Sequence, residues 1–265
     1  SFSVDTFAGG DVKVLISFNV TDADGAGNIN ASTAVVNFTL GTPNEGQFYS
    51  NVSAVASSEF GTCTNHSPSS TVVVINCSVV LPYFANASAN WVINISVKDI
   101  FGGTGRNDTG KFTINTVSGL SLPITFANFT NVNLGQQDVP SSPLIINNTG
   151  NEDFDMLNVS AAPLRGTTTT TETIAVTNFY ANITNATAGL GVQLAATPVI
   201  LRELVQSAGG TGLDNATLMH GHTSAFAPNR DKGNRTVFFW VDVPSSSLSS
   251  QLYNATWNLT VINTP

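Results

Sequence analysis

Apolar and polar residues alternate along much of the chain with the period of two that predicts β-strands. In the stretch "VVVINCSVV", for example, Val73, Ile75, Cys77 and Val79 alternate with polar positions such as Asn76. Only "VILRELVQSA", residues 199–208, could form a short helical turn, and the following glycines end it. The pattern therefore predicts an all-β protein.

The strand-like segments fall into two groups separated by a possible linker at residues 118–123. Turn sequences rich in Gly, Asn and Asp separate the strands of each group, a spacing typical of antiparallel sandwiches. We expect two antiparallel immunoglobulin-like β-sandwich domains in tandem, at residues 11–117 and 124–265, preceded by an N-terminal strand and hinge at residues 1–10. The predicted strands are 11–21, 31–41, 51–57, 70–81, 91–100 and 111–117, then 124–132, 141–151, 154–164, 173–184, 192–201, 236–244 and 251–263.

The N-terminal segment has a pattern suited to strand exchange. Phe2, Val4 and Thr6 alternate with polar residues, and the Gly-Gly pair at 9–10 predicts a hinge. Such a strand could fold back on its own domain or insert into a neighbouring copy of the chain. We expect residues 1–7 to be the main contact between copies, inserted into the neighbour's C-terminal domain.

The chain has few charged residues for its length. Charged residues make up 10% of the 265 residues, whereas an ordinary soluble protein has about a quarter. The net charge of −8 and the scattered basic residues predict neither a nucleic-acid nor an anionic-membrane partner. No apolar run is long enough to predict a membrane span.

Acceptor sequons for N-linked glycan, Asn-x-Ser/Thr, are unusually dense. They include 18 of the chain's 29 asparagines, whereas chance placement predicts about six. We expect most of them to carry glycan, which would supply the solubility that charge does not. The sequons begin at Asn19, Asn30, Asn37, Asn51, Asn65, Asn76, Asn86, Asn94, Asn107, Asn128, Asn147, Asn158, Asn182, Asn185, Asn215, Asn234, Asn254 and Asn258.

Several sequons lie within strand patterns rather than loops. Asn19, Asn37, Asn76 and Asn94 each alternate with apolar residues, and so do Asn254 and Asn258 in "YNATWNLTV". We therefore expect these acceptors to face solvent. The alternative is a Ser/Thr/Asn-rich surface with few used sites.

Cys63 and Cys77, the chain's two cysteines, predict a disulfide that joins a loop to the following strand. Two buried free thiols are the alternative. Because the chain starts at Ser1, we expect a secreted form from which a signal has been removed, although a fragment would look the same. The expected location is extracellular or at the cell surface.

Two sets of segments resemble known surface modules. "FNVTDADGAGNINASTAVVNF" with "WVINISVKDIFG", and "LIINNTGNEDFDMLNVSA" with "YNATWNLTV", are similar to immunoglobulin-like modules of secreted archaeal cell-surface glycoproteins. The overall plan resembles archaeal thread and glycofibril subunits. The resemblance implies a filament whose subunits each donate a strand to a neighbour, and it implies no catalytic residue.

The sequence offers few candidates for chemistry. His66, His220 and His222 are the only histidines; the last two could ligate a metal in "MHGHT", but an exposed polar loop is the alternative we favour. The loop that holds Asp22, Asp24 and Asn28 weakly resembles a calcium loop, with a plain Asp-capped turn as the default. No nucleophile elbow or phosphate-binding motif occurs, so we expect no enzyme, cofactor, metal or small-molecule substrate.

These observations favour a structural subunit that polymerises with identical copies. Outward glycans would obstruct side-by-side packing, whereas head-to-tail contacts remain available. The alternative is a cell-surface adhesion or binding module, or a surface-layer component.

Overall fold

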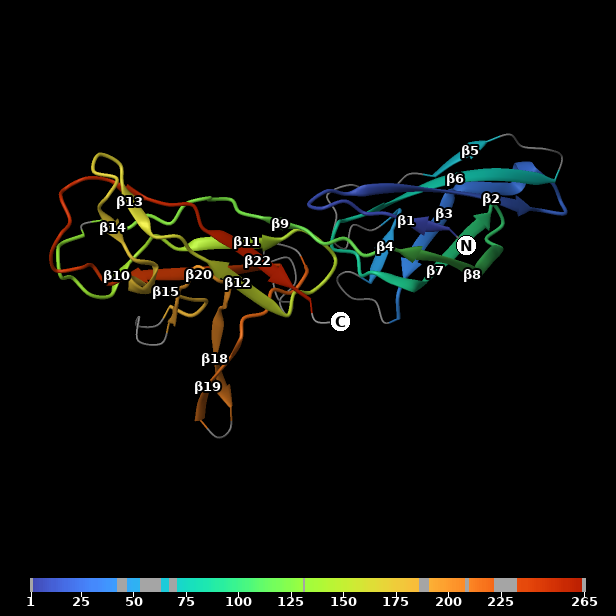
Figure 1. Ribbon diagram of the computed structural model, residues 1–265. Helices are drawn as coiled ribbons and strands as arrows, with labels where there is room; N and C mark the ends of the chain where they lie inside the picture. The colour runs from blue at the N-terminus through green and yellow to red at the C-terminus, as the bar shows by residue number, and fades with distance from the viewer. Residues whose placement is uncertain are drawn as a thin grey trace. The chain divides into compact units, whose positions relative to one another are not determined.

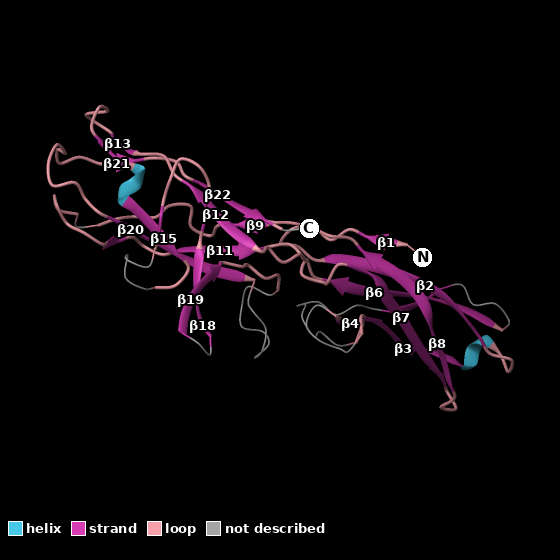
Figure 2. Ribbon diagram, turned by 60° about the horizontal axis from the view of Figure 1, so that its bottom comes forward, coloured by secondary structure: helices cyan, strands magenta, loops and turns pink. Residues whose placement is uncertain are grey.

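The computed structural model describes residues 2–41, 47–52, 63–66, 71–130, 132–185, 191–207, 210–221 and 233–263. Strands make up the regular structure, and Ala26–Asn28 and Val176–Asn178 form the two 3₁₀ turns of the described part (Figure 2). The prediction of an all-β protein is confirmed.

The chain divides into two compact units. The first unit contains residues 1–120, 148–152 and 220–232, and the second contains 121–147, 153–219 and 233–265. The boundary after Leu120 falls within the expected linker, but the later boundaries show that neither unit is one continuous stretch of chain. Two short segments of the C-terminal half therefore belong to the first unit.

The first unit consists of two sheets that form two layers (Figure 1). Neighbouring strands are antiparallel except that β1 runs parallel to β8. One sheet has the order β1 (Ser3–Val4), β8 (Thr104–Ile114), β7 (Ser88–Asp99), β3 (Ile29–Thr39) and β4 (Phe48–Ser50), and the other has β2 (Val12–Thr21), β6 (Val72–Leu81) and β5 (Cys63–His66).

The core of the first unit lies between these two sheets. The alternation predicted for β6 is confirmed up to Cys77, because Val73, Ile75 and Cys77 are buried while Asn76 is half-buried. Trp91 is fully buried, with its ring centroid 5.8 Å from that of Phe112. Long strands with one apolar face thus close a continuous core.

The predicted disulfide between Cys63 and Cys77 is present. The two residues face each other across the β5–β6 ladder, with their Cα atoms 4.0 Å apart. The bond therefore fixes the short edge strand β5 to the long central strand β6, and free thiols are excluded.

The second unit has shorter strands in several smaller sheets. Its largest sheet has the order β16 (Val192–Gln193), β15 (Phe179–Asn182), β20 (Asn234–Val241), β11 (Leu144–Asn148) and β9 (Leu120–Ser121), with β10 (Val139–Pro140) also on β20. The others are β17 (Val199–Ile200), β12 (Met156–Ser160) and β22 (Asn258–Ile262); β14 (Thr173–Ile174), β13 (Leu164–Gly166) and β21 (Tyr253–Asn254); and the hairpin of β18 (Arg202–Ser207) and β19 (Gly210–Asn215).

Several sequence expectations fail in the described part, and the predicted strands 173–184 and 192–201 are each divided into two short strands. Residues 202–207 form strand β18 instead of a helical turn, because they pair along their whole length with β19. Residues 124–132 are largely outside the sheets, with a single bridge from Phe129 to Ser141. The last predicted strand is two strands, β21 and β22, separated by residues 255–257. Residues 53–57 of the third predicted strand lie outside the described residues.

Candidate assembly groove

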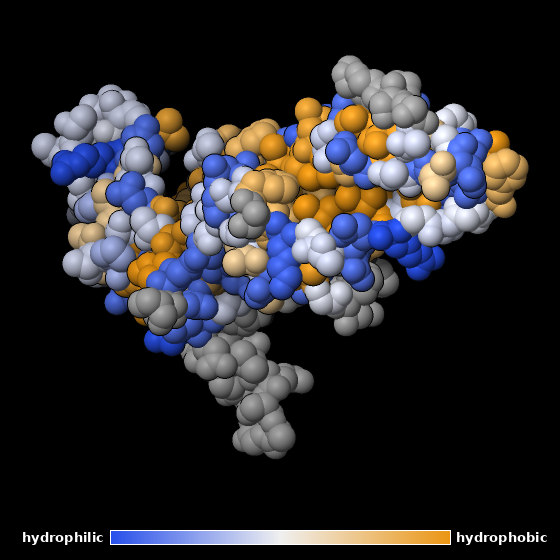
Figure 3. All heavy atoms as spheres, turned by 90° about the vertical axis from the view of Figure 1, so that its right-hand side faces the viewer, coloured by the Kyte–Doolittle hydropathy of each residue, from blue (hydrophilic) through white to orange (hydrophobic). Residues whose placement is uncertain are grey.

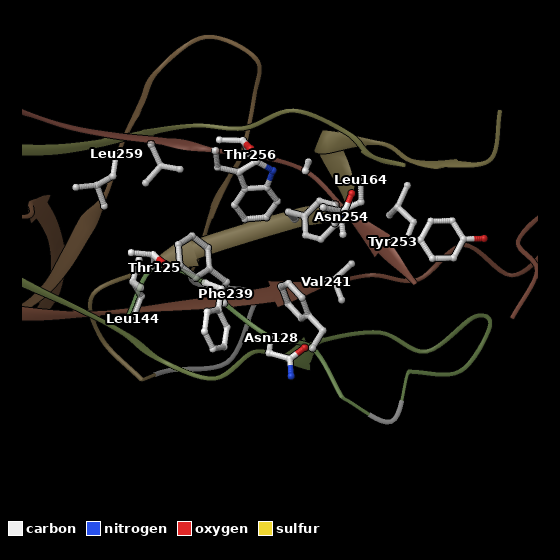
Figure 4. A pocket seen from close by; sticks show the side chains of 18 of the residues that line it. Thr125, Asn128, Leu144, Leu164, Phe239, Val241, Tyr253, Asn254, Thr256 and Leu259 are labelled. Atoms are coloured by element: carbon white, nitrogen blue, oxygen red, sulfur yellow. The ribbon is translucent and has the colours of Figure 1, made fainter. Parts of the chain in front are cut away.

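A groove of about 950 Å³ opens within the second unit (Figure 4). Side chains of β11, β15 and β20 form one side, and side chains of β12, β13 and β22 form the other. Residues from 122–132 and 251–257 complete the lining, and apart from the short strand β21 they connect strands without extending a sheet. The groove therefore lies between the sheets of this unit, where a sandwich normally has packed core.

Aromatic rings form the floor of the groove. Phe179 is fully buried, and its ring lies 5.0 Å from that of Trp257 and 5.8 Å from that of Phe129, measured between centroids. The Trp257 ring is also 5.6 Å from Phe239, and its Nε1–H donates a hydrogen bond of 2.8 Å to the carbonyl of Ala162. The indole is therefore held in place rather than free to turn.

Apolar side chains also stand exposed at the mouth of the groove. Phe126 and Leu252 are each 66% exposed, and Val132 is 39% exposed. None of the lining residues is Asp, Glu, Lys, Arg or His. Burying an unpaired charge in such a place costs several kcal/mol, so the groove suits an uncharged apolar segment.

A free strand edge borders the groove. β22 pairs with β12 on one side, and no described strand pairs with its other side. Leu157 of β12 uses its N–H and C=O to bond Ala216 and Leu201, so its opposite residue Val261 directs its own backbone groups away from β12. Leu259, two residues earlier, does the same. These groups form an unfilled half-ladder that an added strand can complete.

A hydrogen-bonded carboxylate holds one end of the groove wall. Glu172 accepts hydrogen bonds from the Tyr253 hydroxyl at 2.5 Å and from the Ser249 backbone and hydroxyl and the Gln251 amide at 2.8 Å each. These bonds, that of Tyr253 foremost, lower the pKa of Glu172 from 4.5 to about 2. Residues 251–253, which line the groove, are thus fastened to the turn between β13 and β14. No local sequence pattern predicts this network, because Glu172 lies far along the chain from Ser249, Gln251 and Tyr253.

The N-terminal strand β1 lies in the sheet of its own unit. The carbonyls of Phe2 and Val4 accept hydrogen bonds of 3.0 Å from the β8 side, and the Phe2 ring stacks on Phe112 at 5.3 Å. Val4 and Thr6 are buried, as their phase predicted, whereas Phe2 is 42% exposed. This is the arrangement that the sequence left open as the alternative to insertion into a neighbour.

The expected hinge is an ordered turn in this state. Gly9 has a φ of 74°, which favours glycine, and its N–H donates a hydrogen bond of 2.8 Å to the carbonyl of Thr149. The Gly10 N–H donates to the carbonyl of Phe7, closing the turn. The two glycines therefore form a hydrogen-bonded turn while β1 lies in its own sheet.

The sequon asparagines differ widely in exposure. Asn19, Asn65, Asn107, Asn128, Asn185, Asn215, Asn254 and Asn258 are exposed; Asn30, Asn37, Asn76, Asn86, Asn94, Asn147 and Asn234 are half-buried; and Asn51, Asn158 and Asn182 are buried. Of the six strand acceptors singled out from the sequence, three are exposed and three are half-buried: Asn19, Asn254 and Asn258 are exposed, and Asn37, Asn76 and Asn94 are half-buried.

Three acceptors for which the strand pattern predicted no direction are buried. Asn51 accepts a hydrogen bond of 2.7 Å from the Val36 N–H and donates one of 3.0 Å to the Ala34 carbonyl, in the manner of a further strand residue beside β3. Asn158 lies in β12, which has strands on both sides, and Asn182 is completely buried. An oligosaccharide on these amides has no space in this fold.

The other candidate ligands do not gather into a site. No cluster of three or more His, Cys, Asp or Glu side chains occurs among the residues that the structure describes. His220 Nε2 lies 2.9 Å from Asn86 Oδ1, while His222 and the side chain of His66 lie outside the described part. The Asp24 N–H donates to Asp22 Oδ1 at 2.9 Å, as in the plain turn expected there. Over the same described residues, no helix is both long and apolar enough to cross a membrane.

Comparisons with known proteins give little further guidance. No family model matches the chain, and no curated protein matches it. One similar solved structure is reported as "Chaperone-tip adhesin complex is vital for synergistic activation of CFA/I fimbriae biogenesis"; the match has 10% identity and a TM-score of 0.31, and covers 99% of this chain and 96% of that one. A TM-score of this size does not establish a shared fold, so the function proposed below is drawn from the chain's own geometry.

Proposed function

We propose that this protein is the structural subunit of an N-glycosylated extracellular filament, assembled head-to-tail by donor-strand complementation. In this arrangement the N-terminal strand of one copy leaves its own sheet and occupies the groove in the second unit of the next copy. The observation that carries the proposal is the open, uncharged groove with the free edge of β22 beside it. The disulfide supports an oxidising location outside the cytosol.

The pattern of the N-terminal strand suits this groove. Phe2 and Val4 lie on one face of an extended segment, so both can point between the sheets while the backbone pairs with β22. The free backbone groups of Leu259 and Val261 would receive the added strand. In sandwiches of the immunoglobulin-like type that we propose for both units, the added strand fills a position between two sheets.

The strand is also held imperfectly in its own unit. Its ladder with β8 spans two residue pairs, Ser3 with Thr113 and Val4 with Ile114. The hydroxyl of Thr6 is buried without a hydrogen-bond partner among the described residues, which costs about 1–3 kcal/mol. Because β1 has few paired residues and one buried hydroxyl without a hydrogen bond, little free energy is lost when the strand leaves its sheet.

Such a contact joins different surfaces of two copies. Repeated from copy to copy, it therefore builds an open filament instead of a closed ring. The alternating sequons on outward strand faces support a thin filament over lateral packing, because glycan there obstructs broad face-to-face contact. The proposal includes identical subunits as partners, and no catalysis, cofactor, nucleic acid or small-molecule substrate. Its archaeal affiliation rests on the sequence resemblance alone.

Imaging of the purified glycosylated protein tests assembly directly. We expect fibres from the full chain and folded monomers after deletion of residues 1–7. In the groove, Leu259→Arg should abolish fibres because it places a charge on the uncharged wall, whereas Ile262→Arg, on the exposed face of β22, should leave them intact. Fibres of normal length from the deletion variant would place the joint elsewhere.

A surface adhesion or binding module is the second candidate. Apolar side chains gather into a patch on the face displayed in Figure 3, with hydrophilic side chains around it. In the first unit, Phe101 is 79%, Leu15 75% and Ile100 59% exposed, more than a protein without a partner normally leaves uncovered. Persistent monomers whose apolar face binds a cell surface would favour this function over the filament.

A further inference from the structure

Three acceptor asparagines, Asn128, Asn254 and Asn258, line the groove that we propose receives the strand, and the side chains of the first two surround its mouth. Asn128 lies in the segment before β10, and Asn254 is the last residue of β21. Both side chains are exposed, and Figure 4 shows them among the side chains that surround the aromatic rings. The third residues of their sequons, Thr130 and Thr256, are exposed as well. Both sequons are therefore accessible in the folded chain.

Asn258, in strand β22, also lines the groove, but its side chain differs in direction. Leu259 and Val261 of β22 are half-buried, while Asn258, Thr260 and Ile262 are exposed. Successive side chains of a strand point to opposite faces, so the Asn258 side chain leaves the sheet on the face away from Leu259. Glycan on Asn258 stands outside the groove, whereas glycan on Asn254 or Asn128 starts at its mouth.

We propose that N-glycosylation at Asn254 and Asn128 closes the groove, so that the occupancy of these two asparagines decides whether a chain can accept a neighbour's strand. The inference rests on the proposed function and adds a control to the same site. A chain with both asparagines bare extends the filament, and a chain with glycan at either one ends it.

The modification needs a lipid-linked oligosaccharide phosphate as donor and a transferase. The Asn254 Nδ2 forms a bond to C1 of the first sugar and loses one proton, while the bond from C1 to the phosphate oxygen breaks and the lipid phosphate leaves. The product is a neutral amide that carries a bulky hydrophilic group. No charge changes on the protein, so the effect on the groove is steric.

The groove cannot hold glycan and strand together. Its volume is about 950 Å³, the rings of Phe179 and Trp257 border it on one side, and Phe126 and Leu252 stand exposed at its mouth. A sugar attached at the mouth has a high effective concentration there. Where sugar and strand cannot both fit, binding of the strand is lost entirely. The attached glycan therefore excludes the incoming strand without binding the groove tightly.

Site-resolved mass spectrometry of the glycosylated full chain tests this control. Fibres and monomers from one preparation are separated, and occupancy is measured at Asn128, Asn254, Asn258 and Asn19 in each fraction. We expect occupancy at Asn128 and Asn254 to be about tenfold lower in fibres than in monomers, since only bare grooves accept a strand. Occupancy at Asn258 and Asn19 should be equal in the two fractions.

A pair of variants gives an independent readout. The double change Asn128→Gln with Asn254→Gln should raise the fraction of chain found in fibres, while the matched change Asn258→Gln should leave it unaltered. Equal occupancy of Asn254 in fibres and monomers, with fibres still forming, overturns the glycan control but not the filament. Absence of fibres from both the native chain and the double variant overturns the proposed function, and this inference with it.

Discussion

The two units differ in how completely they cover the apolar faces of their strands. In the first unit, β2, β3, β6, β7 and β8 have 10 to 12 residues each, and they enclose a continuous core around Trp91. In the second, the longest described strand, β20, has 8 residues, and the space between the sheets is open. Long paired strands close a sandwich by themselves, whereas short strands joined by irregular segments leave edges that another chain can fill.

The largest expected effect is on the closed core. Trp91→Ala should lower the free energy of unfolding of the first unit by about 3–5 kcal/mol, because the indole is fully buried and its removal leaves a cavity. Trp257→Ala, at the half-buried floor of the groove, should cost the second unit less. Denaturant unfolding of both variants measures the two effects, and an equal loss would contradict the contrast between the units.

Reduction of the disulfide should affect the first unit alone. Cys63 and Cys77 are 14 residues apart, and a closed loop of that size stabilises a fold by about 3 kcal/mol. Unfolding curves with and without reductant should shift for the first unit and coincide for the second, which has no cysteine. A shift in both would show that the units unfold together.

The buried asparagine Asn51 should act as a structural residue and not as a glycan acceptor. Asn51→Ala leaves the Val36 N–H without its partner, at a cost of about 1–3 kcal/mol, whereas Asn19→Ala at an exposed sequon should change little. Thermal unfolding measures both variants. Mass spectrometry should find Asn51, Asn158 and Asn182 bare, and glycan on any of them would require a different local fold.

A smaller effect is expected at the exchangeable strand. Thr6→Val removes the buried hydroxyl that has no partner and should stabilise β1 in its own unit by about 1 kcal/mol. The same change should slow fibre growth, because the strand leaves less readily. The exposed neighbour Ser3→Val is the control for strand propensity, and faster growth of the Thr6 variant would contradict the proposed exchange.

The smallest effect concerns the groove wall and pH. Glu172 has a pKa of about 2 in the fold against an ordinary value of 4.5, so its network contributes fully above pH 4.5 and is lost as pH falls through about 2. By pH 3 the second unit should have lost more than half of this contribution, and Glu172→Gln should remove the dependence on pH between 4.5 and 2. Unfolding measured from pH 5 to 2 tests the difference between the two proteins.

The sequence by itself determined the features that depend on neighbours along the chain. The period of two around Ile75 and Cys77 defines a strand with one apolar face, because successive side chains of any strand alternate. With only two cysteines, Cys63 and Cys77 had a single possible pairing. The phase of Val4 and Thr6 was likewise readable before their sheet was known.

Only the tertiary structure decided which faces are covered and what remains open. The sequon at Asn158 looks like the one at Asn258, yet β12 has strands on both sides, whereas β22 has a described strand on one side only. Phe126, Phe179 and Trp257 form one groove from three distant segments, and no local pattern joins them. A sequence motif predicts which side chains share one face of a strand. Whether that face is buried, and whether the strand edge is free, depends on which other segments pack beside it.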